Sequence, residues 1–310
     1  MLDNGAPKTL DDFKGQEKAK RKLKVCLASA KMRNATIDPV LITARSGMGK
    51  STLASIIANE CGKELRTILC STVKSPDDLI NALIDVQEGE VVFLDEIHSL
   101  TKKAQEVMFS PLECGKVNAK TADGQFIKFD LPQSIVIIAA TTDADKMLTP
   151  LRNRFTNHID LVPYGDDYIA EIIMEAARAH SIEVDAETAK AVAFCCRGVP
   201  RQAKSLVCNL RDFAMVLNNG VVDYDLAAEV LEDQGIDITT GLNNMDRQYL
   251  KFMNENYANK PVGVSTIASS LGFSKSMVET VIEPYLINNG YIIKSVRGRS
   301  LTQKTIEMFD

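Results

Sequence analysis

The fold is decided by Pro39-Val-Leu-Ile-Thr43 and the segment that follows it, Ala44-Arg-Ser-Gly-Met-Gly-Lys-Ser-Thr52. An apolar run, a glycine-rich turn and a run of helix formers predict a strand, a phosphate-binding loop and a helix. The glycines allow backbone N–H groups to turn toward phosphate oxygens, the lysine can reach the β- and γ-phosphates, and a hydroxyl can bind Mg²⁺. We therefore expect a nucleotide to bind at Gly47, Gly49, Lys50, Ser51 and Thr52.

Composition limits the class of protein. With 310 residues, 45% of them apolar, the chain is long enough for two or three domains with buried cores. A net charge of −5 argues against a broad basic surface for nucleic acid but allows a local basic patch. The seven cysteines form no C-x-x-C pair, and no apolar run is long enough for a membrane span or a signal peptide. We expect a globular, cytoplasmic protein with reduced cysteines.

A second apolar run, Val91-Val-Phe-Leu94, stops at Asp95-Glu96. A strand that is apolar on both faces is typical of a parallel sheet, and such sheets bind ligands at the carboxyl ends of their strands. Both carboxylates should therefore lie beside the phosphate loop. Asp95 would hold Mg²⁺ through water, and Glu96 would orient or deprotonate the attacking water. His98 shows no metal-ligand spacing with the other two histidines, so we expect no metal role for it.

Strands and helices alternate up to Tyr164. A third apolar run, 134–140, ends in Thr141-Thr142, which puts hydroxyls at the same edge of the sheet. The alternation predicts an α/β fold, a doubly wound parallel sheet, for a nucleotide-binding domain at residues 1–164.

The pattern then changes to helices only, which indicates an all-α lid domain at residues 165–236. The last segment, residues 237–310, is predicted to form a helix, a helix-turn-helix whose longer helix spans 275–288, and two strand-like pieces around Arg297-Gly-Arg299. This order is typical of a winged-helix domain.

Together these motifs resemble AAA+ ATPases, and more specifically the RuvB family of Holliday-junction branch-migration motors. The resemblance runs from residue 10 to residue 303, and its motifs are Asp95-Glu-Ile-His98, Ala140-Thr-Thr142, Pro150-Leu-Arg-Asn-Arg-Phe155, Gly198-Val-Pro-Arg201, Glu283-Pro-Tyr-Leu286 and Arg297-Gly-Arg299. It implies an ATP hydrolase that acts on DNA in recombination and repair. Such a helicase is expected to pull duplex or branched DNA through a homo-oligomeric ring, a hexamer, with ATP and Mg²⁺ as cofactors.

The resemblance also implies roles around the nucleotide. Thr142 matches the sensor threonine near the γ-phosphate, Arg201 matches the lid arginine that closes over the nucleotide, and Tyr164 matches a residue that lines the pocket. Arg154 matches the arginine that projects into the next subunit's site, with Arg152 as its substitute. An arginine supplied by a neighbour makes hydrolysis depend on ring assembly.

In the wing, Lys294 and Arg299 match positions that hold DNA phosphates in the family, and Arg297 adds a third positive charge within six residues. Phosphate contacts carry no direct sequence information, so we expect little sequence preference.

Three departures from the family pattern stand out. Ala44 replaces the first glycine of the phosphate loop, as in some other helicase families, and we expect binding to survive. Gly5-Ala6 stands where the family has a leucine-arginine pair near the base, so base contacts should be looser. The hairpin at 116–130, through which the family docks on the junction-binding protein RuvA, is shorter. It carries polar residues in place of an apolar tip, which argues against a RuvA-like partner: Asn118, Lys120, Thr121, Asp123 and Gln125.

Two other interpretations share much of this pattern. A clamp-loader or replication-initiator type AAA+ protein would carry every ATPase motif, and the wing motifs favour the branch-migration motor over it. A ring subunit that binds ATP and DNA without turnover is disfavoured by the complete set of Lys50, Asp95, Glu96, Arg154 and Arg201.

Overall fold

The computed structural model describes residues 7–120, 123, 125–258 and 260–309. The chain forms two compact units, the first containing residues 1–179 and 199–205 and the second containing residues 180–198 and 206–310. The three-domain boundaries expected from the sequence stay a prediction. In the described part, no helix is both long and apolar enough to span a membrane.

A five-stranded parallel sheet in the order β2-β3-β6-β1-β7 forms the centre of the first unit. Residues 40–42, 91–94 and 136–140 of its three middle strands are at most 3% exposed, because both faces of the sheet are covered. The doubly wound parallel sheet is therefore confirmed. Its strands are β1 (Val40–Thr43), β2 (Glu64–Leu69), β3 (Glu90–Asp95), β6 (Val136–Thr141) and β7 (Asn157–Asp160).

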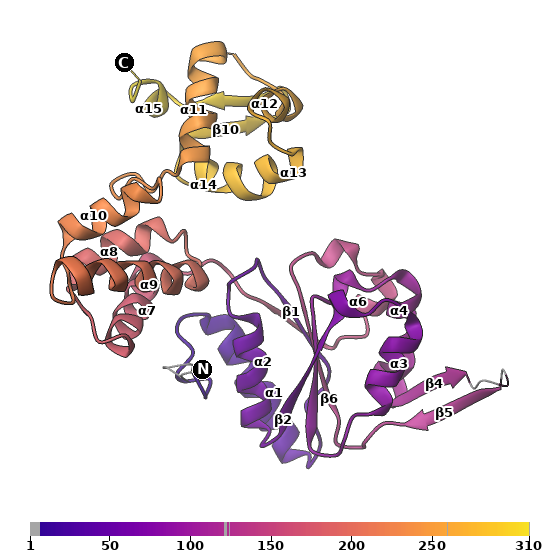
Figure 1. Cartoon of the computed structure of the whole chain (residues 1–310). Coiled ribbons are helices and arrows are strands. Elements are labelled where there is room, and N and C mark those ends of the chain that lie inside the picture. Colours follow the sequence, from indigo (N-terminus) through magenta and orange to yellow (C-terminus); the bar gives the residue numbers. More distant parts are fainter. Residues whose placement is uncertain (1–6, 121–122, 124, 259, 310) are drawn as a thin grey trace. The chain divides into compact units, whose positions relative to one another are not determined.

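Helices cover both faces of this sheet, with α1 and α2 on one side and α3 and α4 on the other (Figure 1). Helix α3 begins with a capping box between Ser75 and Asp78 and has Pro76 as its first residue. The helices of this unit are α1 (Glu17–Met32), α2 (Lys50–Glu60), α3 (Pro76–Ile84), α4 (Lys102–Val107), α5 (Phe109–Cys114), α6 (Thr149–Arg152) and α7 (Asp166–Ala179), with 3₁₀ turns η1 (Cys70–Thr72), η2 (Ile97–Ser99) and η3 (Ala144–Lys146).

An antiparallel hairpin, β4 (Lys116–Lys120) and β5 (Phe126–Asp130), forms a separate sheet and projects outward beside α3 (Figure 1). Thr121 of the expected polar tip lies outside the described residues, as does Gly5-Ala6. Val117 is buried at the base, whereas Ile127 and Phe129 are exposed. The hairpin thus carries exposed apolar side chains on β5, although the polar positions in its sequence predicted little apolar surface.

The second unit contains α8 (Ala186–Cys195), most of α9 (Pro200–Leu217) and α10 (Tyr224–Asp233). The structure adds a short parallel pair to the expected helices, β8 (Glu183–Val184) with β9 (Val221–Val222).

The winged helix follows in the same unit, and its buried apolar side chains form a core of their own. Its elements are α11 (Asn244–Tyr257), α12 (Val264–Leu271), α13 (Lys275–Met277), η4 (Val278–Ile282), α14 (Glu283–Asn288), β10 (Ile292–Ser295), β11 (Gly298–Leu301) and α15 (Gln303–Ile306).

The helix expected over 275–288 is present with these bounds, but it is not a regular α-helix throughout. The structure divides it into α13, a π-helical turn at η4, and α14. Pro284 in the first turn of α14 has no N–H, and its ring would clash with the carbonyl four residues earlier, so a regular α-helix cannot run through it. A π turn is a common way to absorb such a break.

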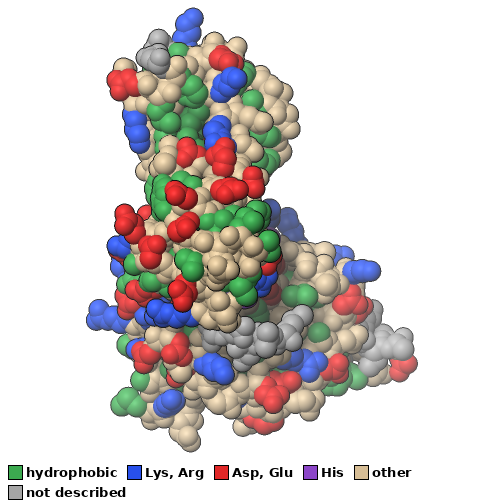
Figure 2. Space-filling model, turned by 60° about the vertical axis from the view of Figure 1, so that its left-hand side comes forward, with side chains coloured by type: hydrophobic (Ala, Val, Ile, Leu, Met, Phe, Trp, Pro, Cys, Tyr) green, Lys and Arg blue, Asp and Glu red, His purple; other side chains and the backbone are tan. Residues whose placement is uncertain are grey.

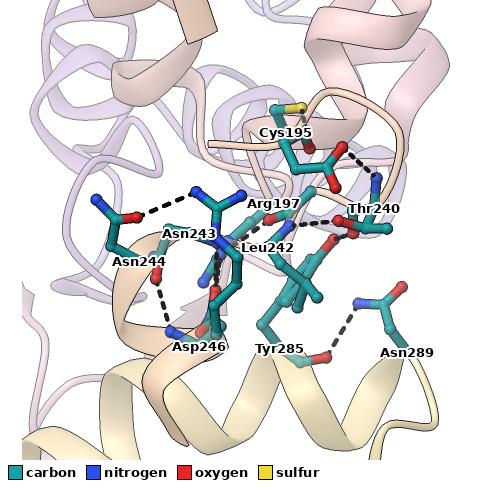
Figure 3. Close-up of polar contacts among 12 residues, drawn as sticks. Cys195, Arg197, Thr240, Leu242, Asn243, Asn244, Asp246, Tyr285 and Asn289 are labelled. Atoms are coloured by element: carbon teal, nitrogen blue, oxygen red, sulfur yellow. Dashed lines mark hydrogen bonds and ion pairs between the residues drawn. The ribbon is translucent and has the colours of Figure 1, made fainter. Parts of the chain in front are cut away.

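A buried ion pair joins the end of α8 to the winged helix. Arg197 lies among side chains of α11 and α14 (Figure 3), pairs with Asp246 and donates from Nη2 to the Gly241 carbonyl at 3.0 Å. The carbon at the centre of its guanidinium lies 4.0 Å from the ring centroid of Tyr285. Asp246 is 0% exposed, accepts the Asn243 N–H at 2.8 Å, and leaves Oδ1 without a hydrogen-bond partner among the described residues. Each charge of the pair is therefore neutralised mainly by the other.

We predict that Asp246→Ala lowers the free energy of unfolding by about 3–5 kcal/mol, because it leaves the Arg197 charge unpaired in a mostly buried place. Urea unfolding followed by circular dichroism measures the loss. Asp78→Ala is the matched control, since Asp78 closes the same kind of capping box on an exposed helix start and should cost only about 1 kcal/mol. Equal losses in the two variants would mean that the ion pair contributes nothing.

Candidate nucleotide-binding site

The phosphate loop joins β1 to α2. Gly47 and Gly49 have φ of 80° and 95°, in the left-handed region that favours glycine. A Cβ on Gly47 would also lie 2.9 Å from atoms of both Val199 and Arg201. Ala44 is not among the described residues with positive φ, so its position in the loop makes no demand for glycine. This explains how the loop keeps its form despite the departure at Ala44.

Lys50 begins α2 and is only 6% exposed. Its Nζ donates to the Ala44 carbonyl at 3.2 Å and lies 3.4 Å from Glu96 Oε1. The ammonium group is therefore held over the loop, between the backbone and a carboxylate.

A cavity of about 270 Å³ opens beside this lysine. Its lining combines the loop, the carboxyl end of β3 and the first turns of α9. The lining residues are Ser46, Gly47, Gly49, Lys50, Ser51, Thr52, Asp95, Glu96, Pro200, Arg201 and Lys204.

Asp95 ends β3, where the sequence places it. Burial raises the pKa of its carboxyl, and the neighbouring Glu96 charge raises it further. A cation would offset both effects, so Mg²⁺ binding should weaken as pH falls toward this raised pKa. Ser51 and Asp95 line the same cavity and could hold Mg²⁺ with water and phosphate oxygens, the ligand set that Mg²⁺ prefers. The described residues contain no cluster of three or more metal-binding side chains, and such a site needs none.

Glu96 lies next to Asp95 in the left-handed conformation, with φ of 53°. Its Oε2 accepts from the Thr142 hydroxyl at 3.0 Å and from the Thr142 N–H at 3.3 Å. His98 Nδ1 lies 3.2 Å from the same oxygen. The structure thus brings the expected base and the expected sensor threonine into direct contact.

Arg201 reaches the phosphate loop, as the resemblance implies. Its Nη1 donates to Ser46 Oγ at 3.0 Å, and its backbone N–H donates to the Gly47 carbonyl at 3.2 Å. Lys204 lines the same cavity and was missed by sequence reasoning. Its spacing from Arg201 on one helix, three residues, is the signal that could have found it.

Aromatic side chains pack against the other side of the loop. A Cβ on Gly49 would lie 3.3 Å from the Phe13 ring and 4.0 Å from the Tyr164 hydroxyl. Burial raises the pKa of Tyr164 to about 12, so the phenol stays neutral. Tyr164 was expected near the pocket, whereas nothing in the sequence singles out Phe13.

The two candidate arginine fingers lie elsewhere. Arg154 pairs with Glu113 at 2.5 Å, donates to the Pro150 carbonyl at 2.8 Å and stacks on Phe109 at 4.3 Å. Arg152 lies 3.8 Å from Asp145. Among the described residues that line the chain's own cavity there is neither of these arginines.

The wing cations differ sharply in accessibility. Arg297 is exposed and Lys294 is half exposed, 3.8 Å from Glu279. Arg299 is buried, with Nε 2.6 Å from Glu283 Oε1 and Nη2 3.1 Å from Glu279 Oε1. The guanidinium of Arg299 is therefore paired with carboxylates inside the domain and is not presented to a phosphate. Its role in DNA binding stays a prediction. On the face shown in Figure 2, basic and acidic side chains are interspersed and form no broad basic area.

A glycine-rich loop, a buried lysine, paired acids after a buried strand and an arginine over the loop define a P-loop nucleoside triphosphatase. Comparison with known proteins identifies the family within this class. The RuvB P-loop domain matches residues 6–161, the RuvB AAA lid domain matches residues 164–237, and the RuvB C-terminal winged-helix domain matches residues 239–310. The chain belongs to the RuvB family.

Individual relatives agree over nearly the full length. The chain is 37% identical to the Holliday junction branch migration complex subunit RuvB of Bdellovibrio bacteriovorus, over 96% of this chain and 91% of that protein. The RuvB subunit of Kosmotoga olearia is 36% identical, over 96% of this chain and 87% of that protein. A solved structure of the Thermotoga maritima RuvB branch-migration motor is 34% identical with a TM-score of 0.82, covering 98% of this chain and 97% of that chain.

We predict that Gly47→Ala weakens ATP binding about 5- to 150-fold, because strain of about 1–3 kcal/mol must be overcome to form the loop. Ala44→Gly is the control and should change affinity by less than ~3-fold, since no positive φ is needed there. Titration calorimetry with ATP in the presence of Mg²⁺ gives both dissociation constants. Wild-type affinity in Gly47→Ala would contradict the assigned loop geometry.

Proposed function

We propose that the protein is an ATP-driven DNA motor of the RuvB type, in which a ring of subunits couples ATP hydrolysis to movement of duplex DNA at Holliday junctions. The observation that carries the proposal is the meeting of Lys50, Glu96 and Thr142 at the edge of the cavity, at distances of 3.4 and 3.0 Å from the carboxylate. These are the groups needed to bind a γ-phosphate and to activate water beside it. Such a motor acts in DNA recombination and repair, in the cytoplasm.

In this proposal the backbone N–H groups of the loop and Lys50 hold the phosphates, while Thr142 contacts the γ-phosphate. Glu96 orients the attacking water and accepts its proton. Arg201 and Lys204 add positive charge where the nucleotide lid closes. Mg²⁺, held by Ser51 and Asp95, would neutralise charge on the β- and γ-phosphates when bound.

The last component comes from a neighbouring subunit. Arg154 lies away from its own cavity, in a segment whose contacts are Glu113, Pro150 and Phe109. To reach the adjacent nucleotide it would exchange Glu113 for a phosphate, one anionic partner for another. A closed homo-oligomeric ring, a hexamer, would repeat this arrangement at every interface.

DNA contact is proposed at the wing tip, through Lys294 and Arg297. Both are accessible, and charge contacts of this kind act on phosphates without reading sequence. A second macromolecule, a RuvA-like junction-binding protein, is proposed to dock on the β4–β5 hairpin. Ile127 and Phe129 support this docking because they are exposed large apolar side chains on a projecting hairpin.

We predict that Glu96→Gln and Arg154→Ala each abolish most ATP hydrolysis, and that mixing them restores part of it. An Arg154→Ala subunit keeps Glu96 and can receive Arg154 from a Glu96→Gln neighbour, so about a quarter of sites become complete in a random equimolar ring. Phosphate release is measured across mixing ratios, with ring formation checked by size.

The control is a mixture of Arg152→Ala with Glu96→Gln. It tests the other candidate arginine, Arg152, in the same assay. No recovery at any ratio in rings that contain both Arg154→Ala and Glu96→Gln would rule out a trans role for Arg154.

For the wing, we predict that Arg297→Ala weakens binding to unrelated duplexes about equally. The dependence of log affinity on log salt should flatten by about 0.9 for each phosphate that the variant no longer neutralises. Arg299→Ala should instead lower the melting temperature of the protein, because it removes the nearest cation from buried Glu283. Among the described residues, this leaves Glu283 only the Tyr249 hydroxyl and Lys294 at 4.0 Å. Unchanged affinity and salt slope in both Arg297→Ala and Lys294→Ala would move the DNA-binding surface away from the wing.

A further inference from the structure

Both oxygens of the Glu96 carboxylate have partners. Lys50 faces Oε1 at 3.4 Å, and the Thr142 hydroxyl and N–H bond Oε2 at 3.0 and 3.3 Å. His98 Nδ1 lies 3.2 Å from Oε2. These contacts fix the carboxylate before any nucleotide is bound.

Two of these side chains, Lys50 and Thr142, are also expected to bind the phosphates of ATP. If Glu96 is the base of the proposed function, Lys50 and the Thr142 hydroxyl turn toward the phosphates when ATP binds. Glu96 then keeps only the Thr142 N–H and His98. Its backbone is in the left-handed region, a conformation that costs about 1 kcal/mol or more in a residue other than glycine and needs support from its surroundings.

His98 is anchored independently of the nucleotide. It lies in η2, is mostly buried at 16% exposure, and its Nδ1 is 3.0 Å from Thr141 Oγ1. Thr141 is fully buried at the end of β6, and its hydroxyl accepts the Asp143 N–H at 3.0 Å. The ring is therefore held by the sheet and not by the phosphate loop.

Nδ1 faces two oxygens, Thr141 Oγ1 and Glu96 Oε2, and a carboxylate oxygen can only accept, so we assign the ring proton to Nδ1. The Thr141 hydroxyl already accepts one N–H, and the carboxylate is the stronger acceptor of the two. A proton on Nδ1 therefore bonds Glu96 and directs its second oxygen toward the cavity.

We propose that His98 is a positioning residue for Glu96, which holds the catalytic carboxylate in place while ATP draws Lys50 and Thr142 away. This rests on the proposed role of Glu96 as the base. It gives a function to a histidine for which the sequence suggested none.

The test uses side chains that place a donor at different ring positions. The amide nitrogen of Asn can occupy the place of Nδ1, whereas that of Gln can occupy only the place of Nε2. His98→Ala and His98→Gln should therefore slow single-turnover ATP cleavage ~10–100-fold, the effect of losing one hydrogen bond to a charged group. His98→Asn should stay within ~3-fold of wild type, and KM for ATP and ADP affinity should change less than ~2-fold in all three variants.

Three results would overturn the proposal. They are wild-type cleavage in His98→Ala, equal losses in His98→Asn and His98→Gln, or a loss of nucleotide affinity that accounts for the slower rate. If His98→Ala does not fold, the comparison of the Asn and Gln variants decides alone. Glu96→Gln is measured in parallel, because turnover in that variant would refute the role of Glu96 itself, separately from that of His98.

Discussion

The carboxyl edge of the parallel sheet is the constraint on which the rest of the site depends. β1, β3 and β6 are buried on both faces and run side by side in one direction, so their ends must emerge at the same edge. That edge collects the phosphate loop from β1, Asp95 and Glu96 from β3, and Thr141 and Thr142 from β6. The sheet thereby brings groups from three separate parts of the chain within hydrogen-bonding distance of one another.

At this edge of the sheet, the positions of the side chains depend on the pairing of opposite charges. Lys50 is nearly buried and Glu96 is its nearest carboxylate, so the site balances its own charge before the nucleotide arrives. Nucleotide binding must then replace one set of partners by another. His98 matters in this account because it can hold Glu96 through that exchange from a position on the sheet side.

The chemistry of the strand ends could be predicted from the sequence because it depends on local patterns. Apolar runs of strand length that stop at Asp95 and Thr141, and two glycines before Lys50, are visible without coordinates. Phe13 and His98 were not predicted as site residues, because their partners are far along the chain or depend on the geometry of a turn. Lys204 could have been found by helical spacing.

In the winged helix, the accessibility of the basic residues could not be predicted from the sequence. Three positive charges in six residues predict one basic patch, yet the strand pairing turns Arg299 inward and leaves Arg297 outside. The carboxylates that bind Arg299, Glu279 and Glu283, lie on η4 and α14, at a π turn that the sequence did not predict within this helix. The ion pair of Arg197 with Asp246 was equally invisible, since the sequence pattern assigns its two partners to different domains. A cluster of basic residues in the sequence therefore predicts a basic surface only where the fold brings no acidic side chain next to it.

The central claim is that ATP drives a closed ring along duplex DNA. The most direct test is electron microscopy of the Glu96→Gln variant with ATP and a four-way DNA junction, since the variant should bind ATP without turning it over. The account predicts closed six-membered rings that encircle duplex arms of the junction. Open arcs seated at DNA ends, as for a clamp loader, or single subunits scattered along the DNA, would contradict it.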